Sequence, residues 1–233
     1  MTASAIVVPL DGSEFAQRAR RVAAPLAERF GCGVVEVTAE HEPALTIFAT
    51  AAESAGRVVC MSTHGRGRAR RAVLGSVAEA VMAATVEPVL LVGRHCADDW
   101  LDVGRGVVVG VDGSPAGVPA TAAACSWAAA LALDVWLVHV VHPLDNDAAA
   151  HAHRVLDPLA EQVRAAGLRA HPAVARGTHA AGAFVDAAEE VPATLLVTGT
   201  EARAGVRRAV LGSFTMGTVA HAECPVLAVP PAR

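Results

Sequence analysis

The chain has 233 residues, of which 53% are hydrophobic and 18% are charged, a composition that supports a packed core and excludes wholesale disorder. It carries 19 Lys and Arg residues against 23 Asp and Glu residues, and a net charge of −4 argues against the basic groove of a nucleic-acid-binding protein. The five scattered cysteines form no C-x-x-C pair and no secretory signal opens the chain, so we expect a reduced, cytoplasmic location.

The first half begins with a short apolar strand at residues 6–10, which ends in the turn Asp11-Gly12-Ser13. Apolar residues then recur at helical spacing over residues 16–30. The pattern further predicts strands at 34–38, 57–61 and 89–92, a helix near 44–55 and a helix that begins at Gly75-Ser76.

The second half opens in the same way, with a strand at 107–111 and an Asp-Gly-Ser turn at 112–114. Residues 113–133 carry no charge, but they are mostly alanine, which is too weakly apolar for a membrane span of about 20 residues. We interpret this stretch as a buried helix. The pattern then predicts strands at 135–141, 168–175, 194–198 and 226–229, and helices at 148–166, 180–190 and 213–221. Alternating strands and helices predict an α/β protein with a doubly wound, Rossmann-like parallel sheet in each half.

An internal repeat relates the two halves. Residues 70–76 (RRAVLGS) recur unchanged at 207–213, which is 137 positions later, and PVL at 88–90 recurs at 225–227 with the same separation. The two Asp-Gly-Ser turns are only 101 positions apart, and the difference of 36 residues is about one strand–helix unit. We therefore predict tandem domains at residues 1–97 and 104–233, the first truncated by one such unit. We align the strand at 34–38 with the third strand of the second half, so that the first half lacks its second strand.

Each half places small residues where a parallel sheet binds ligands, at the carboxyl ends of its strands. The strand at 57–61 runs into STHGRG at 62–67, and Gly75-Ser76 begins the next helix. Glycine lets backbone N–H groups approach a phosphate, the helix N-terminus contributes about half a positive charge, and Ser76 can both cap the helix and bind phosphate. An isolated Gly-Ser is more often only a helix start, but two copies at one spacing favour a phosphate site.

These motifs resemble the universal stress protein family, in tandem. The family is marked by V-D-G-S after the first strand and by G-x2-G-x9-G-[ST] after the fourth. The first half contains VVPLDGS, STHGRG, LGSVAE and PVLLV, and the second contains VVGVDGS, LVHVV, LLVTGT, LGS and CPVLAV. The resemblance implies a stress-response protein that binds ATP, with Mg²⁺, or another adenine nucleotide without rapid turnover.

The resemblance also implies a set of nucleotide-binding positions, with the first-strand Asp at the base and the glycine motif at the ribose and phosphates. In the first half they are Pro9, Asp11, Ser62, Gly65, Gly75, Ser76 and Val77, and in the second half Asp112, Val140, Gly199, Gly212, Ser213 and Phe214.

Each half departs from the family motif. Ser62 replaces the first glycine in one copy, and Ala202 replaces the middle glycine in the other. A Cβ at a position that needs positive φ costs about 1–2 kcal/mol. In the family the strand after the first helix lines the adenine pocket, and Val140 is the matching position. We therefore expect a missing base wall in the first half, a poorer phosphate loop in the second, and at most one working site.

Other functions receive less support. Asp11 and Asp112 could bind Mg²⁺ or could simply form turns. The pairs His139/His142 and His151/His153 supply no four-ligand zinc set, and we expect His139 to be a strand residue with a satisfied ring. Neither G-x-S-x-G nor a P-loop is present, so we expect no enzyme, although slow ATP hydrolysis stays open.

Protein partners stay open as well. The alternative to nucleotide sensing is a nucleotide-independent interaction module for an unidentified protein partner. The apolar final strands at 89–92 and 226–229 predict exposed sheet edges, which invite pairing. Because such strands mediate dimerisation in the family, we expect the halves to form a pseudo-dimer within one chain, and a homodimer is a further possibility.

Overall fold

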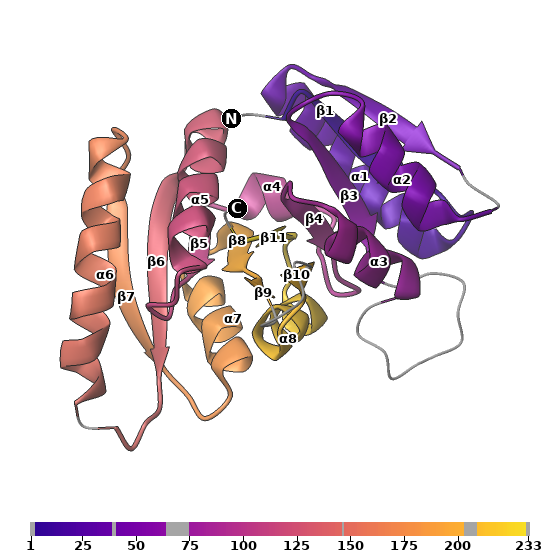
Figure 1. Cartoon of the computed structure of the whole chain (residues 1–233). Helices are drawn as coiled ribbons and strands as arrows, with labels where there is room; N and C mark the ends of the chain where they lie inside the picture. Colours follow the sequence, from indigo (N-terminus) through magenta and orange to yellow (C-terminus); the bar gives the residue numbers. More distant parts are fainter. Residues whose placement is uncertain (1–2, 39–40, 64–74, 146, 203–208, 232–233) are drawn as a thin grey trace.

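The structure is a computed structural model that describes residues 3–38, 41–63, 75–145, 147–202 and 209–231 (Figure 1). The first half contains β1 (Ala5–Pro9), α1 (Glu14–Phe30), β2 (Gly33–Val37), α2 (Pro43–Ala52), β3 (Arg57–Ser62), α3 (Ser76–Ala84) and β4 (Val89–Val92). After the short α4 (Trp100–Val103), the second half contains β5 (Gly106–Gly110), α5 (Gly117–Leu131), β6 (Asp134–Val141), α6 (Ala148–Ala165), β7 (Ala170–Arg176), α7 (Ala180–Glu190), β8 (Ala193–Gly199), α8 (Ser213–His221) and β11 (Val226–Val229). A small ribbon, β9 (Glu201–Ala202) and β10 (Ala209–Val210), precedes α8.

Nine strands form one sheet in the order β2-β1-β3-β4-β11-β8-β5-β6-β7. Neighbouring strands within each half are parallel, which confirms the predicted α/β fold. Helix α5 contacts both α1 and α6, while α2 packs with α3 and α7 packs with α8 (Figure 1). The strands contribute mostly buried Val and Leu to the core, and α1 meets α5 through an edge-to-face contact between Phe30 and Trp127 at 5.1 Å.

The first half is shorter by one strand–helix unit, but the missing unit is not the predicted one. β2 pairs with β1 just as β6 pairs with β5, and the N–H of Leu10 donates to the carbonyl of Val37 at 2.8 Å. The N–H of Val111 repeats this bond to Val138, 101 positions later. Our alignment of β2 with the third strand is therefore wrong. A strand that follows a helix after a short link commonly pairs with the strand that precedes that helix. The unit that the first half lacks is therefore the counterpart of α6 and of the edge strand β7.

The final strands of the halves join the two parts of the sheet. β11 pairs antiparallel with β4, with Val226 opposite Leu91, Leu227 opposite Leu90 and Ala228 opposite Val89. This is the pairing within one chain that the two apolar edges predicted. Because β4 and β11 are antiparallel, the strands of the first half and those of the second half run in opposite directions, and their carboxyl ends lie on opposite sides of the sheet. The link at residues 93–105, which contains α4, joins the last strand of the first half to the first strand of the second, and we propose residues 1–97 and 104–233 as the limits of the halves. No helix in the described part of the chain is long and apolar enough to span a membrane.

Candidate functional site

The first strand of each half ends in the same tight turn. The Asp11 carboxylate accepts the N–H of Ser13 at 2.9 Å, and the Asp112 carboxylate accepts the N–H of Ser114 at 2.9 Å. In each turn a glycine lies between the Asp and the Ser. The φ angle is 78° at Gly12 and 83° at Gly113, a backbone conformation that residues with a side chain rarely adopt. Both aspartates thus serve as turn residues. Among the described residues, no group of three or more His, Cys, Asp or Glu side chains is placed to hold a metal ion.

The glycines before α3 and α8 leave open space beside the helix N-termini. Gly75 and Gly212 occupy the N-cap positions in extended conformation, and glycine has no side chain with which to cap its own helix. Ser76 is therefore the first helical residue and not the cap that the sequence suggested. A Cβ on Gly212 would meet nothing within 4 Å, and one on Gly75 would meet only the Thr63 carbonyl at 3.6 Å. Packing within the described residues therefore requires glycine at neither position, whereas a closely approaching ligand would.

The first glycine of the motif has a structural explanation instead. Gly199 ends β8, and a Cβ there would lie 2.8 Å from the Cβ and the carbonyl of Ala116, at the start of α5. Neither Gly199 nor Ser62, its counterpart at the end of β3, has positive φ. Ala202 belongs to the extended strand β9. The expected backbone strain at Ser62 and Ala202 is therefore wrong, and at Gly199 the requirement for glycine comes from side-chain space.

Phe214 packs over the end of β5 in the second half. A Cβ on Gly110 would lie 2.9 Å from the Phe214 ring, which also contacts Phe184 with ring centroids 5.3 Å apart. The corresponding residues in the first half are Pro9 and Val77. The larger residue of the pair therefore comes from the strand in the first half and from the helix in the second. The sequence held this signal, because the aligned halves show Pro9 opposite Gly110.

The base side of the second half is more enclosed than that of the first. Nδ1 of His139 donates to the Val111 carbonyl at 2.9 Å, so this buried ring is satisfied, as expected. Val155 of α6 covers Gly113, since a Cβ there would lie 3.0 Å from its methyl group. The first half has no counterpart of α6, and Thr38, which corresponds to His139, is exposed.

The structure brings most of the predicted nucleotide-binding residues to the expected edges. Pro9 ends β1 and Asp11 follows it, beside the end of β3 at Ser62. Ser76 and Val77 begin α3. Val140 lies beyond the last β5–β6 pair, opposite Ala175 of β7. Gly65 lies outside the described residues. Sequence reasoning missed Thr200, the residue after Gly199. Its buried hydroxyl has no hydrogen-bond partner within the described part of the chain.

Comparison with models of known families matches the universal stress protein family over residues 31–93 and 105–230. The chain belongs to this family. The matched segments fall in both halves, so this is a tandem universal stress protein in which the first Asp-Gly-Ser turn precedes the matched region. No curated protein matches the sequence.

Two solved structures share the fold over nearly the whole chain. A universal stress protein from Archaeoglobus fulgidus DSM 4304 aligns over 100% of both chains at 18% identity and a TM-score of 0.70. A functionally unknown protein from Pseudomonas aeruginosa PAO1 covers 98% of this chain and 93% of its own at 17% identity and a TM-score of 0.65. A universal stress protein from Archaeoglobus fulgidus, solved in complex with dAMP, covers 54% of this chain and 98% of its own at 23% identity and a TM-score of 0.46.

Proposed function

We propose that this universal stress protein is a stress-response protein that binds an adenine nucleotide, ATP with Mg²⁺ among the candidates, without rapid turnover. The observation that carries the proposal is that two helices begin at the glycine N-caps Gly75 and Gly212, and packing within the described part of the chain requires glycine at neither position. A helix N-terminus of this kind favours a phosphate, and glycine permits its close approach.

We further propose that the first half holds the tighter site. Its β2 supplies the strand beside β1 that was expected to be missing, and no helix corresponding to α6 covers its turn. In the second half the Val111 carbonyl already accepts a bond from His139, which leaves this backbone group less available to a base. The orphan hydroxyl of Thr200 supports residual, weaker binding there, because a buried polar group gains by finding a partner.

Calorimetric titration with ATP–Mg²⁺ tests both statements, with Gly75→Val and Gly212→Val as matched variants. Both positions have extended backbone and room for a side chain, so both variants should fold. We expect Gly75→Val to weaken binding by at least about tenfold, because the side chain occupies the phosphate approach, and Gly212→Val to remove only the weaker event. Equal effects would contradict the preference for the first half.

Absence of any binding heat at millimolar nucleotide would contradict the nucleotide proposal and favour an interaction module. Release of phosphate from ATP that Asp11→Ala or Asp112→Ala abolishes would contradict the proposal that turnover is absent. A cytoplasmic location, association with a protein partner and formation of a homodimer stay predictions from the sequence.

A further inference from the structure

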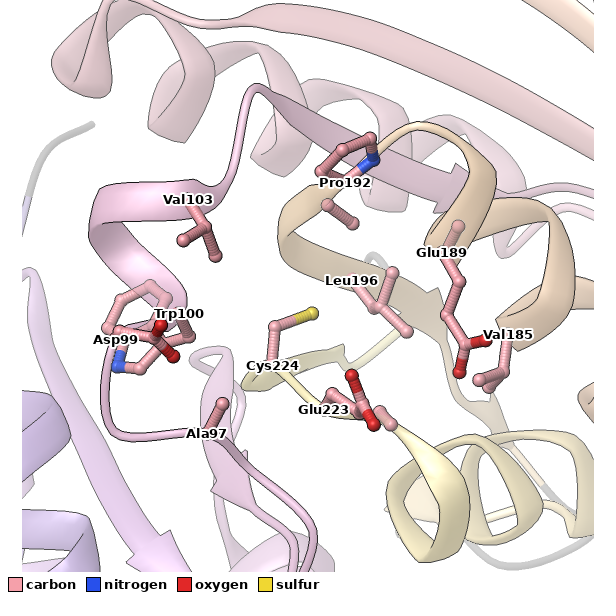
Figure 2. A pocket seen from close by; sticks show the side chains of 13 residues that line it. Ala97, Asp99, Trp100, Val103, Val185, Glu189, Pro192, Leu196, Glu223 and Cys224 are labelled. Carbon is pink, nitrogen blue, oxygen red and sulfur yellow. The ribbon is translucent and has the colours of Figure 1, made fainter.

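A cavity lies at the junction of the two halves, away from the carboxyl ends of β5 and β8. It has a volume of about 320 Å³ and is lined by the link with α4, by α7, by the start of β8 and by the segment before β11 (Figure 2). The N–H of Ala97 donates to the Glu223 carbonyl at 2.8 Å and ties two of these walls together. The cavity thus exists because α4 folds over the second half, and its size falls at the small end of the range for ligand sites.

The inner wall of this cavity is apolar. Cys224 and Leu196 form its floor, Val185 of α7 lines one side, and Val103 of α4 lines the other (Figure 2). Burial raises the pKa of the Cys224 thiol, so it stays neutral and adds no charge to the wall. Val103 is 53% exposed, so its methyl groups are accessible to a molecule in the cavity.

Three carboxylates surround the apolar wall. Asp99 precedes α4, Glu189 comes from α7 and Glu223 precedes β11, and all three are exposed (Figure 2). No basic residue lines the cavity, and in the described part of the chain no salt bridge involves any of the three. Asp99 also makes no side-chain bond that caps α4.

The nearby arginines are engaged elsewhere. Arg21 pairs with Asp98 at 3.5 Å, and the Arg105 guanidinium lies against the carbonyl oxygens of Asp102 and Gly104. An apolar pocket with an uncompensated negative rim is complementary to an apolar group that carries a positive charge.

We propose that this junction cavity binds a small primary amine with an apolar body, an arylalkyl amine or aliphatic amine. The hydrocarbon part lies against Leu196, Val185 and Val103, and the ammonium group lies between the carboxylates of Glu189 and Glu223. The site is separate from the nucleotide site and does not depend on the proposed function.

Calorimetric titration of the full chain with 2-phenylethylamine, 2-phenylethanol and 3-phenylpropionate tests the charge preference. The three probes share a phenylalkyl body and differ in charge. We expect the amine to bind more tightly than the alcohol, the anion not to bind measurably, and added salt to weaken only the amine. Equal affinities for the three probes, or no binding of the amine, would overturn the proposal.

Variants then locate the site. Glu189→Gln with Glu223→Gln should weaken amine binding by about tenfold, roughly threefold for each exposed carboxylate, and leave the alcohol unchanged. Asp157→Asn, an exposed carboxylate of α6 outside the lining, is the matched control and should change nothing. Ala193→Leu, at a half-buried lining position, should abolish binding of both amine and alcohol.

A competition experiment separates this site from the nucleotide site. Excess ATP–Mg²⁺ should not displace 2-phenylethylamine, and competition between them would overturn the proposal. If Ala193→Leu unfolds, the two Gln variants still decide, because exchange of an exposed carboxylate for an amide disturbs no packing. An unchanged amine affinity in that double variant would also overturn the proposal.

Discussion

Pro9 and Val77 in the first half stand where Gly110 and Phe214 stand in the second. In the second half the Phe214 ring lies where a Cβ on Gly110 would be only 2.9 Å away, and Phe184 lies close behind at 3.3 Å. Protein interiors are close-packed, so a side chain on the strand and a ring on the helix exclude one another. The same space at the end of the first strand is therefore filled from opposite sides in the two halves.

This exclusion predicts coupling between the two positions. Gly110→Ala should lower the free energy of unfolding by about 1–3 kcal/mol, because the new methyl overlaps the Phe214 ring. Combining it with Phe214→Val should cost at least about 1 kcal/mol less than the sum of the single variants. Urea unfolding measures all three proteins, with Gly182→Ala as the control, since a Cβ on Gly182 of α7 meets nothing within 4 Å. Additive losses would contradict the contact.

A charged cluster links the starts of β6 and β7. Asp134 accepts bonds from Nε2 of His171 at 3.0 Å and from Nε of Arg169 at 2.8 Å, and the His171 ring stacks on Trp136 at 4.4 Å. The hydrogen bond from His171, followed by the bond from Arg169, holds the pKa of the Asp134 carboxyl below its usual value. Its contribution to stability is therefore complete above the pKa of the unfolded chain, near 4, and is lost as the pH falls through the lower folded pKa.

Asp134→Asn should accordingly destabilise the protein by about 1 kcal/mol at neutral pH, since the paired groups are partly exposed. The difference from the parent should shrink as the pH falls below about 4, where the unfolded carboxyl takes up its proton. Thermal unfolding between pH 7 and pH 3 measures this difference. A gap that stays constant over the whole range would show that the carboxylate charge contributes nothing.

At the scale of elements, the lost unit changes the role of one strand. β6 lies between β5 and β7 and is mostly buried, whereas its counterpart β2 has only β1 as a neighbour and forms an edge of the sheet. An edge strand leaves half of its backbone N–H and C=O groups unpaired within the sheet. Glu36, which pairs with Arg20 at 2.5 Å, places a charge on this edge and discourages pairing with another chain.

Amide hydrogen exchange should therefore differ between the two equivalent strands. We expect alternate amides of β2 to exchange quickly and those of residues 135–138 in β6 to be protected nearly as strongly as the sheet core, because these residues pair with both β5 and β7. Mass spectrometry of peptides over residues 33–37 and 134–141 measures both. Equal protection would instead indicate that a second copy or another chain covers β2.

At the scale of the whole molecule, the seam between β4 and β11 makes one sheet from two repeats. Leu90 and Leu227 lie opposite one another in this pair, and both are fully buried. The core on each side of the seam is continuous, so neither half can expose its last strand without cost to the other. The molecule should consequently unfold as one cooperative unit.

Calorimetry tests this cooperativity. We expect a single transition whose calorimetric and van't Hoff enthalpies agree, and Leu90→Ala should lower its stability by about 2–5 kcal/mol without splitting it. Leu156→Ala on α6, also fully buried but on the far side of the second half, is the control for an ordinary core loss. Two resolved transitions would mean that the repeats unfold independently.

Local patterns in the sequence determined the helices and strands, the duplication and the family, because periodicity and turn residues act over a few neighbouring positions. The helix at 213–221 and the strands at 89–92 and 226–229 were predicted to the residue. Only the tertiary structure decided which unit the first half lacks, because a strand's place depends on its neighbours in the sheet and not on its order in the chain. It alone also distinguished Gly199, required by Ala116, from Gly75 and Gly212, which packing leaves unexplained, and revealed the cavity at the junction. These features arise where segments far apart in the sequence meet, and no local pattern encodes such contacts.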